Sequence, residues 1–181
     1  MKPETLKKFL FICLFAVSAT LSMTAAKPLT LKQIEEMSGA QAENLVNGKQ
    51  YVDLGLPSGN LWYVGDDYVS WNENSKYPSK KDYEELILCC TWKWVEVEGL
   101  KGYLVTGLNK NSIFLPAAGY FEPGLKQVRG KGFLGQYWSS TTSQNKKEEM
   151  LAWSLRFGDK GKRMTTAYKG VPFTYCLILS K

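Results

Sequence analysis

Residues 111–121 read NSIFLPAAGYF, and this stretch decides how the centre of the chain folds. Three large apolar residues (113–115) are followed at once by Pro116, two alanines and Gly119. So short an apolar run favours a strand over a helix. Proline gives no N–H to a β ladder, and glycine accepts positive φ. We therefore predict an apolar central strand over 113–115 that ends at Pro116, and a contact loop that starts at Phe121.

The segments around this strand alternate with period two. Residues 91–98 (TWKWVEVE) and 103–107 (YLVTG) predict a hairpin that turns over 99–102. The final two predicted strands, 152–157 and 171–179, alternate well enough to pair with each other in one antiparallel sheet. The glycine-rich residues 119–133 predict an irregular loop. Other short strands are predicted at 51–54, 61–62, 66–71 and 136–140.

Two segments carry helical signals. Thr30 with Gln33 has the pattern of a capping box, and the apolar face that follows predicts a helix or helical pair that stops at Gly48. Ser79 with Asp82 opens a second helix, in which apolar residues recur at intervals of three and four. Helices and strands together predict one α+β domain, with short antiparallel strands, one or two helices and long loops.

The N-terminus predicts export. Residues 1–26 combine Lys7 and Lys8, an apolar segment over 9–21 and small residues up to Ala26, which is the architecture of a signal peptide. About thirteen apolar residues are too few to cross a bilayer, which needs about twenty. We expect an exported protein in the periplasm, at the cell surface or secreted, with no membrane span after cleavage. Residues 27–49 then form an N-terminal helical leader.

Composition excludes several function classes. The 181 residues include no histidine, which rules out histidine-dependent nucleophilic triads and histidine-ligated metal sites. Cleavage after residue 26 removes three lysines and one glutamate, leaving 20 basic and 16 acidic residues and a net charge of +4. Opposite charges interleave, and no dense basic stripe of the nucleic-acid-binding kind occurs.

Three cysteines remain after export. Cys89 and Cys90 are adjacent, and Cys176 lies near the C-terminus. The sequence leaves two states open: three free buried thiols, or a long-range disulfide from Cys176 to one of the pair, with Cys90 as the candidate. No CxxC motif indicates redox or metal chemistry.

Exposed aromatic and polar groups on loops are the candidate ligand contacts. Trp71, Asn72 and Glu73 offer a ring, an amide and a carboxylate. Their oxygens would suit calcium, but the spacing is irregular and we assign no metal ligand. The YWSST segment lacks the glycine elbow and the histidine of a serine hydrolase. The predicted ligand-binding residues are Trp71, Asn72, Glu73, Phe121, Trp138, Ser139 and Ser140.

Five blocks in order resemble a known family. They are YVDLGLPSGNLW, DDYVSWNE, YPSKKDYEELILCCTWKW, GYLVTGLNKNSIFLPAAGY and GQYWSST. The chain is similar over about residues 51–179 to the Fibrobacter succinogenes major paralogous domain family (FISUMP), whose members are exported proteins common in Bacteroidota. The resemblance implies a C-type-lectin-like fold over residues 50–181, in the branch that includes the formylglycine-generating enzymes. The chain departs from the family pattern at 63–65, which is shortened, and at 74–79 and 172–176.

The resemblance brings no enzymatic activity and no cofactor. Formylglycine-generating enzymes use a copper-binding cysteine pair, whereas Cys89 and Cys90 lie where a helix passes into a strand, so we carry over no catalytic residue. We expect a cell-envelope or secreted binding module whose ligand is a glycan or a surface protein. The alternative is a structural or adhesin-accessory envelope protein without a small-molecule ligand.

Overall fold

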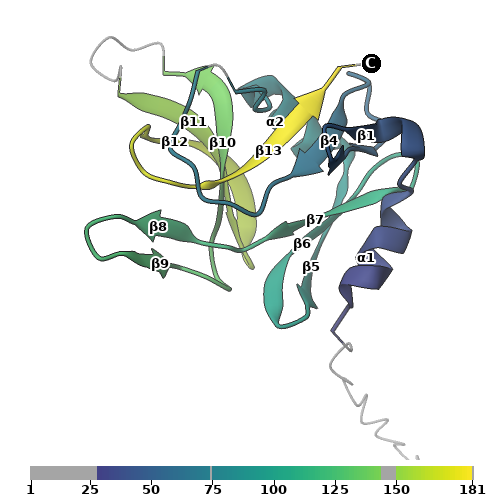
Figure 1. The fold of residues 1–181 in the computed structure, drawn as a ribbon, viewed down its shortest axis with the longest axis horizontal. Helices are drawn as coiled ribbons and strands as arrows, with labels where there is room; N and C mark the ends of the chain where they lie inside the picture. The colour runs from purple at the N-terminus through teal and green to yellow at the C-terminus, as the bar shows by residue number, and fades with distance from the viewer. Residues whose placement is uncertain (1–27, 74, 144–149, 181) are drawn as a thin grey trace, which may run out of the picture.

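The computed structural model describes residues 28–73, 75–143 and 150–180, and the predicted signal peptide lies outside them (Figure 1). The described residues have an α+β fold, as predicted, made mostly of β-sheet with two short α-helices. Neither helix is long and apolar enough to cross a membrane.

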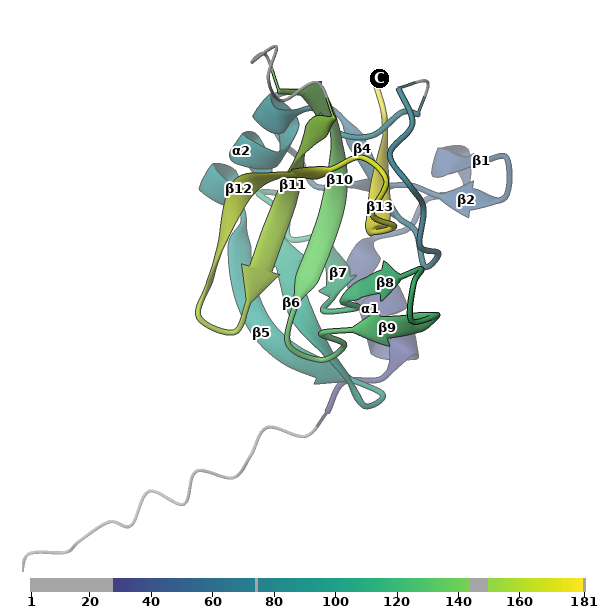
Figure 2. The same cartoon turned by 90° about the vertical axis from the view of Figure 1, so that its left-hand side faces the viewer.

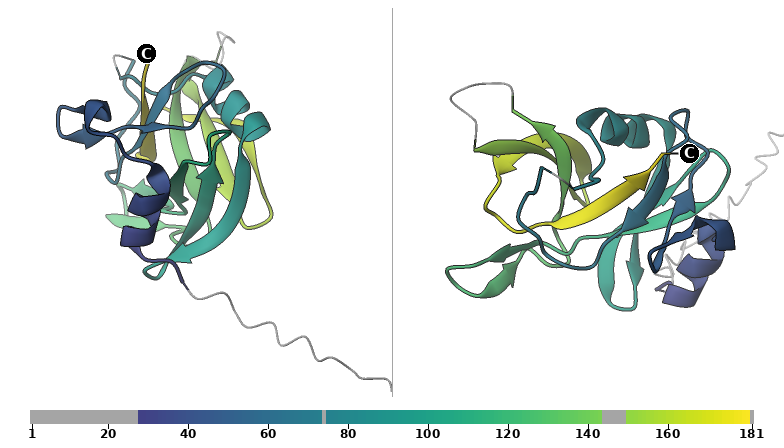
Figure 3. Two further views of the ribbon diagram at one scale, coloured as in Figure 1. Left: turned by 90° about the vertical axis from the view of Figure 1, so that its right-hand side faces the viewer. Right: turned by 45° about the horizontal axis from the view of Figure 1, so that its top comes forward.

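A six-stranded sheet forms the body of the fold. Its order is β12-β11-β10-β13-β4-β3, and all neighbours are antiparallel except β10 and β13, which run parallel. Figure 3 shows the C-terminal strand β13 running beside β4. The strands are β3 (Val52–Asp53), β4 (Leu61–Val64), β10 (Gly135–Thr142), β11 (Leu151–Gly158), β12 (Gly161–Tyr168) and β13 (Thr174–Leu179).

The predicted pairing of 152–157 with 171–179 is wrong. Both sides of β11 are occupied, by β10 and by β12, so β13 pairs instead with β10 and β4. The sequence did not predict β12 because GKRMTTAY is largely polar, as suits a strand at the edge of a sheet. The strand predicted at 66–71 is reduced to one bridge, between Val69 and Phe173.

A second sheet contains the predicted hairpin. It consists of β5 (Thr91–Val97), β6 (Leu100–Thr106) and β7 (Ser112–Pro116), in that order. The turn is at Glu98 and Gly99, not over 99–102. Both turn residues have positive φ, +47° and +83°, as a two-residue hairpin of type I′ requires.

Strand β7, which contains residues 113–115, is an edge strand and not the central strand we predicted. β7 pairs only with β6, and Pro116 is tolerated at its end because an edge strand has a free side. Ile113 and Leu115 are buried as expected, while Phe114 is half-buried on the other face, toward α1.

Both predicted helix starts are confirmed. Thr30 and Ser79 each close a capping box, at the N-termini of α1 (Leu31–Ser38) and α2 (Lys80–Cys89). The predicted stop at Gly48 is wrong, because α1 ends at Gly39 in the left-handed conformation that glycine tolerates. In Figure 2, α2 lies beside β10, β11 and β12, which it contacts, and α1 packs on β7.

The remaining elements are small. The predicted irregular loop over 119–133 in fact contains a hairpin. The N-terminal leader is joined to the second sheet, because the Leu29 N–H donates to the Glu96 carbonyl at 2.7 Å. These small elements are η1 (Ala42–Asn44), β1 (Leu45–Val46), β2 (Lys49–Gln50), β8 (Tyr120–Glu122) and β9 (Gln127–Arg129).

Apolar clusters cover both faces of the six-stranded sheet. The larger cluster lies between this sheet, α2 and the second sheet, and includes Trp62, Tyr83 and Tyr137. The smaller one, with Trp138 and Phe173, covers the opposite face. Because β10 lies between them, its first five residues are all buried. Burial of this kind is the main stabilising term in folding, at roughly 25 cal/mol per Å² of apolar area.

Residues 116–119 join the second sheet to the rest of the molecule. The Tyr137 hydroxyl donates to the Pro116 carbonyl at 2.8 Å, and the Tyr68 hydroxyl donates to the Ala118 carbonyl. The side chains of Tyr68 and Tyr137, from distant parts of the chain, therefore hold the segment that follows β7 in one position.

The same segment fixes the loop over 130–134. The Gly132 N–H donates to the Ala117 carbonyl at 2.7 Å, and the Gly119 N–H donates to the Leu134 carbonyl at 2.7 Å. Two backbone segments lie so close here that residue 119 has no room for a side chain.

Replacing Gly119 with alanine should strongly destabilise the fold. A Cβ atom there would lie 2.0 Å from the Arg129 carbonyl oxygen, and φ is +78°. We expect a loss of about 3 kcal/mol in the free energy of unfolding, measured by urea denaturation. Gly170→Ala is the control, since its Cβ would meet nothing within 4 Å. Equal stability of the two variants would contradict the assigned role of Gly119.

Candidate functional site

The structure buries two of the predicted ligand-binding residues. Trp138 and Ser139 are both 0% exposed, and the Trp138 indole donates to the Val69 carbonyl at 2.9 Å. Their prediction as ligand contacts is wrong, because β10 lies inside the sheet with apolar clusters on both faces.

The other predicted residues lie in two places. Trp71 is half-buried, and its indole N–H donates to the Ser139 carbonyl at 2.8 Å, next to the half-buried Ser140. Asn72 and Glu73 follow Trp71 and are exposed. These residues are therefore close to one another, at the C-terminal end of β10.

Phe121 lies on β8, away from β10. Its N–H donates to the Pro172 carbonyl at 3.0 Å, and its side chain is half-buried. Trp71 and Phe121 are thus held by hydrogen bonds to neighbouring segments, whereas Ser140 lines a cavity of about 440 Å³ together with Lys76 and Tyr77.

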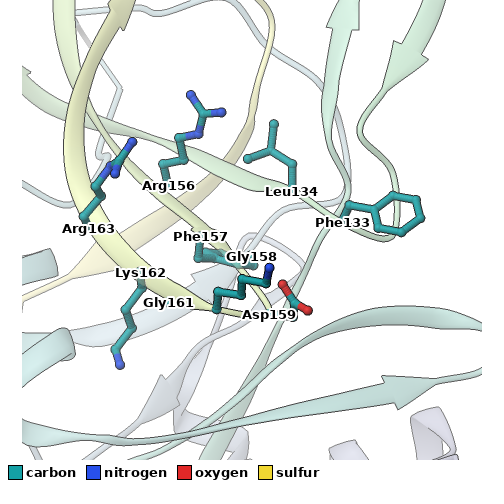
Figure 4. Close-up of a pocket in the computed structure, with 10 residues that line it drawn as sticks. Phe133, Leu134, Arg156, Phe157, Gly158, Asp159, Gly161, Lys162 and Arg163 are labelled. Carbon is teal, nitrogen blue, oxygen red and sulfur yellow. The ribbon is translucent and has the colours of Figure 1, made fainter.

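A pocket of about 520 Å³ lies at the opposite end of the same strands, where β11 turns into β12 (Figure 4). The hairpin closes with Gly158 opposite Gly161, which leaves a two-residue loop at 159–160. The β10–β11 register places Gly135 and Phe157 at this end and Thr142 and Ala152 at the other. At about 3.4 Å per residue, several residues of strand separate the pocket from Ser140.

Two arginines stand side by side in this pocket. Arg156 on β11 and Arg163 on β12 are directly opposite in the antiparallel register, and both are exposed. Directly opposite residues have Cα atoms about 4.5–5.5 Å apart and side chains on the same face. Figure 4 shows both guanidinium groups pointing to one side of the hairpin. Like charges so placed repel, which makes the pair unusual.

Neither arginine has a partner for its charge. The ion pairs formed among the described residues include neither of them, and neither do the described hydrogen bonds or ring contacts. The pair therefore presents two unneutralised guanidinium groups to solvent.

Lys160 also lines the pocket, while two other charged groups of the hairpin, Lys162 and Asp159, interact with the second sheet. Lys162 points to the opposite side in Figure 4, and its Nζ lies 4.9 Å from the centre of the Trp92 ring. Burial raises the pKa of Tyr103 on the second sheet, and the negative charge of Asp159 raises it further. Asp159 forms no ion pair with the described lysines and arginines.

Phe133 lies at the edge of the pocket, and in Figure 4 its ring points away from the two arginines. Its side chain is 76% exposed, which is high for so large an apolar group. The backbone beneath it is well fixed, since the N–H groups of Phe133 and Leu134 both donate to the Gly130 carbonyl, at 3.0 and 2.8 Å. The pocket thus combines an exposed ring on a fixed turn with unpaired cations, the mixture of apolar and oriented polar groups that ligand sites use.

Sequence reasoning missed this site although a signal was present. Residues 158–161 (GDKG) separate two strands, and a tight turn there places residues 157 and 162 opposite each other, then 156 and 163. We interpreted this run as a connection between 152–157 and 171–179, so the pairing of the two arginines did not emerge.

No protein-family model matches this sequence, and no match was found among curated proteins or solved structures. The functional argument therefore rests on the geometry of the pocket.

A second cavity of about 530 Å³ lies along α1, between this helix and the two sheets. Its lining is mainly apolar, with Ile34 and Phe114 among its residues, and the charged groups that reach it are the acids Glu35 and Asp66. It offers no cation, and so differs in chemistry from the pocket at the hairpin.

The described cysteines are free thiols. The candidate disulfide between Cys90 and Cys176 is wrong, and the helix geometry gives the reason. Cys176 interacts with Tyr83, in the first half of α2, whereas Cys90 caps the end of that helix. Seven helical residues span about 10 Å, beyond the reach of a disulfide.

Burial keeps the thiols of Cys90 and Cys176 protonated. It raises the pKa of Cys176 to about 12, against a smaller lowering by the hydrogen bond with the Tyr83 hydroxyl. Burial also raises the pKa of Cys90 to about 12, with further contributions from Cys89 and Glu85. Neither group is a thiolate near neutral pH, so neither is a ready nucleophile.

The raised thiol pKa values make stability depend on alkaline pH. In the unfolded chain a cysteine loses its proton near pH 9, while folded Cys90 and Cys176 keep theirs to about 12. The folded state thus binds more protons in this window, and stability that is complete below pH 9 should fall as the pH rises toward 12. Urea denaturation at a series of pH values measures this.

The control for the pH series is Cys90→Ala, which should make the decline between pH 9 and 12 less steep. An unchanged slope in this variant would show that Cys90 titrates normally in the folded protein.

Proposed function

We propose that this chain is an exported binding module with a C-type-lectin-like fold, whose ligand is a glycan of the bacterial surface. The signal-peptide pattern of residues 1–26 and the resemblance to the FISUMP family support export and fold. The observation that carries the binding role is the pocket at the end of β11 and β12, with the exposed Phe133 at its side and unpaired cations within it.

The chemistry of the pocket fits a sugar. Ligand sites combine apolar walls with a few oriented polar groups. Phe133 offers a flat apolar face that can pack against the C–H face of a sugar ring, and Arg156 and Arg163 offer several N–H donors to its oxygen atoms. Each of these groups stands on a hydrogen-bonded element, so little ordering is needed on binding.

The same pocket argues for binding without catalysis. Glycoside hydrolysis generally uses two carboxylates that flank the scissile bond. Among the described residues that line the pocket, Asp159 is the one carboxylate, and its charge acts on Tyr103. The chain also has no histidine for acid–base work. We therefore propose a binding protein and not an enzyme.

Removing the Phe133 ring should abolish most glycan binding. Phe133→Ser removes the aromatic ring, and because the side chain is 76% exposed the fold should keep its stability. An array of bacterial surface polysaccharides, followed by titration of each positive glycan, measures the effect. We expect affinity to fall by about tenfold or more, as loss of a central aromatic contact does.

The control is Leu88→Ser, which removes an 82% exposed apolar side chain from α2 and should leave binding unchanged. The alternative role, a structural or adhesin-accessory envelope protein, makes the opposite prediction. It would be supported if no glycan bound and cross-linking in intact envelopes captured one protein partner whose yield did not depend on Phe133.

A further inference from the structure

We propose that the pocket recognises an anionic group of the glycan, a carboxylate or a sulfate, held between Arg156 and Arg163. This inference rests on the glycan-binding role proposed above and names the chemical class of its ligand.

The first argument is the repulsion between the two arginines. Arg156 and Arg163 are directly opposite on neighbouring strands, and like charges in this position destabilise a sheet. Two positive charges so placed repel each other, although water weakens the repulsion. An anion bound between them turns this repulsion into two attractions, so the free protein holds a site that an anion completes.

The second argument is that Arg156 and Arg163 keep their charges uncompensated. Arg129 is paired with Glu122, and Lys162 lies over the Trp92 ring. Arg156 and Arg163 have neither kind of partner among the described residues. Lys160, which also lines the pocket, is unpaired among the described residues as well, so the two arginines and this lysine are available for an anionic ligand.

The third argument is geometry. A guanidinium group presents its N–H donors in a planar fork that matches the oxygens of carboxylate and sulfate. The two forks come from paired strands, so their spacing is set by the ladder of β11 and β12 and not by a mobile loop. Gln136, opposite Arg156 on β10, continues a polar row, and its amide is held by a hydrogen bond of 3.1 Å to Ser154.

Carboxylated and sulfated glycans share the chemistry that this site requires, and direct titration separates them. Three polysaccharides serve as probes: polygalacturonate carries carboxylates, dextran sulfate carries sulfates, and unmodified dextran carries no charge. We expect saturable binding of polygalacturonate, dextran sulfate or both, and none of unmodified dextran. Which charged polymer binds more tightly identifies the anion.

The variants are Arg156→Gln, Arg163→Gln and the double variant. Each single change should weaken binding of the charged polymer by about tenfold or more, as loss of a charge-assisted hydrogen bond does. The melting temperature should stay the same or rise, because the substitution removes like-charge repulsion. Lys81→Gln is the matched control, since Lys81 is an exposed cation on α2 and its loss changes the net charge equally.

Three results would overturn the inference. A loss of binding in Lys81→Gln as large as in Arg156→Gln would show a general polyelectrolyte effect. Binding to neutral glycans that depends on Phe133 but not on the arginines would leave the proposed function standing without an anion site. Binding of no glycan, charged or neutral, would remove both the inference and the glycan-binding role.

Discussion

The architecture depends on the close approach of two backbone segments at Gly119. With φ of +78° and the Arg129 carbonyl oxygen where a Cβ would lie, this position admits glycine alone without strain. Through it the second sheet meets the loop over 130–134, and the hydroxyl of Tyr137 ties the same segment to β10. Gly119 thereby allows the segment that follows β7 to lie directly against residues 129–134, next to the turn that carries Phe133.

The ladder of β11 and β12 holds Arg156 and Arg163 opposite each other although their charges repel, because burial elsewhere in the sheet outweighs this screened repulsion. Under our proposal, an anionic ligand relieves this repulsion. The pocket therefore differs from the surface at Trp71, whose indole N–H already donates to the Ser139 carbonyl.

Local signals in the sequence predicted local structure well. Thr30 and Ser79 correctly predicted where the two helices begin, because a capping box is completed within four residues. Pairing across long distances was not predictable in this way. Trp138 is predicted as a ligand contact, whereas β10 is covered on both faces and buries this ring. The pairing of Arg156 with Arg163 depends on the register of β12, a polar edge strand with little apolar pattern to reveal it.

The most direct test of the account is the location of the ligand on the protein. Backbone amide resonances, followed by NMR while an acidic oligosaccharide such as a galacturonate oligomer is added, report which residues it touches. The account predicts that the largest shifts occur over 156–163 and at Phe133. Shifts concentrated over 71–73 and at Ser140 would contradict it and would place the binding surface on the loops that the sequence indicated. Shifts concentrated along α1 would also contradict it.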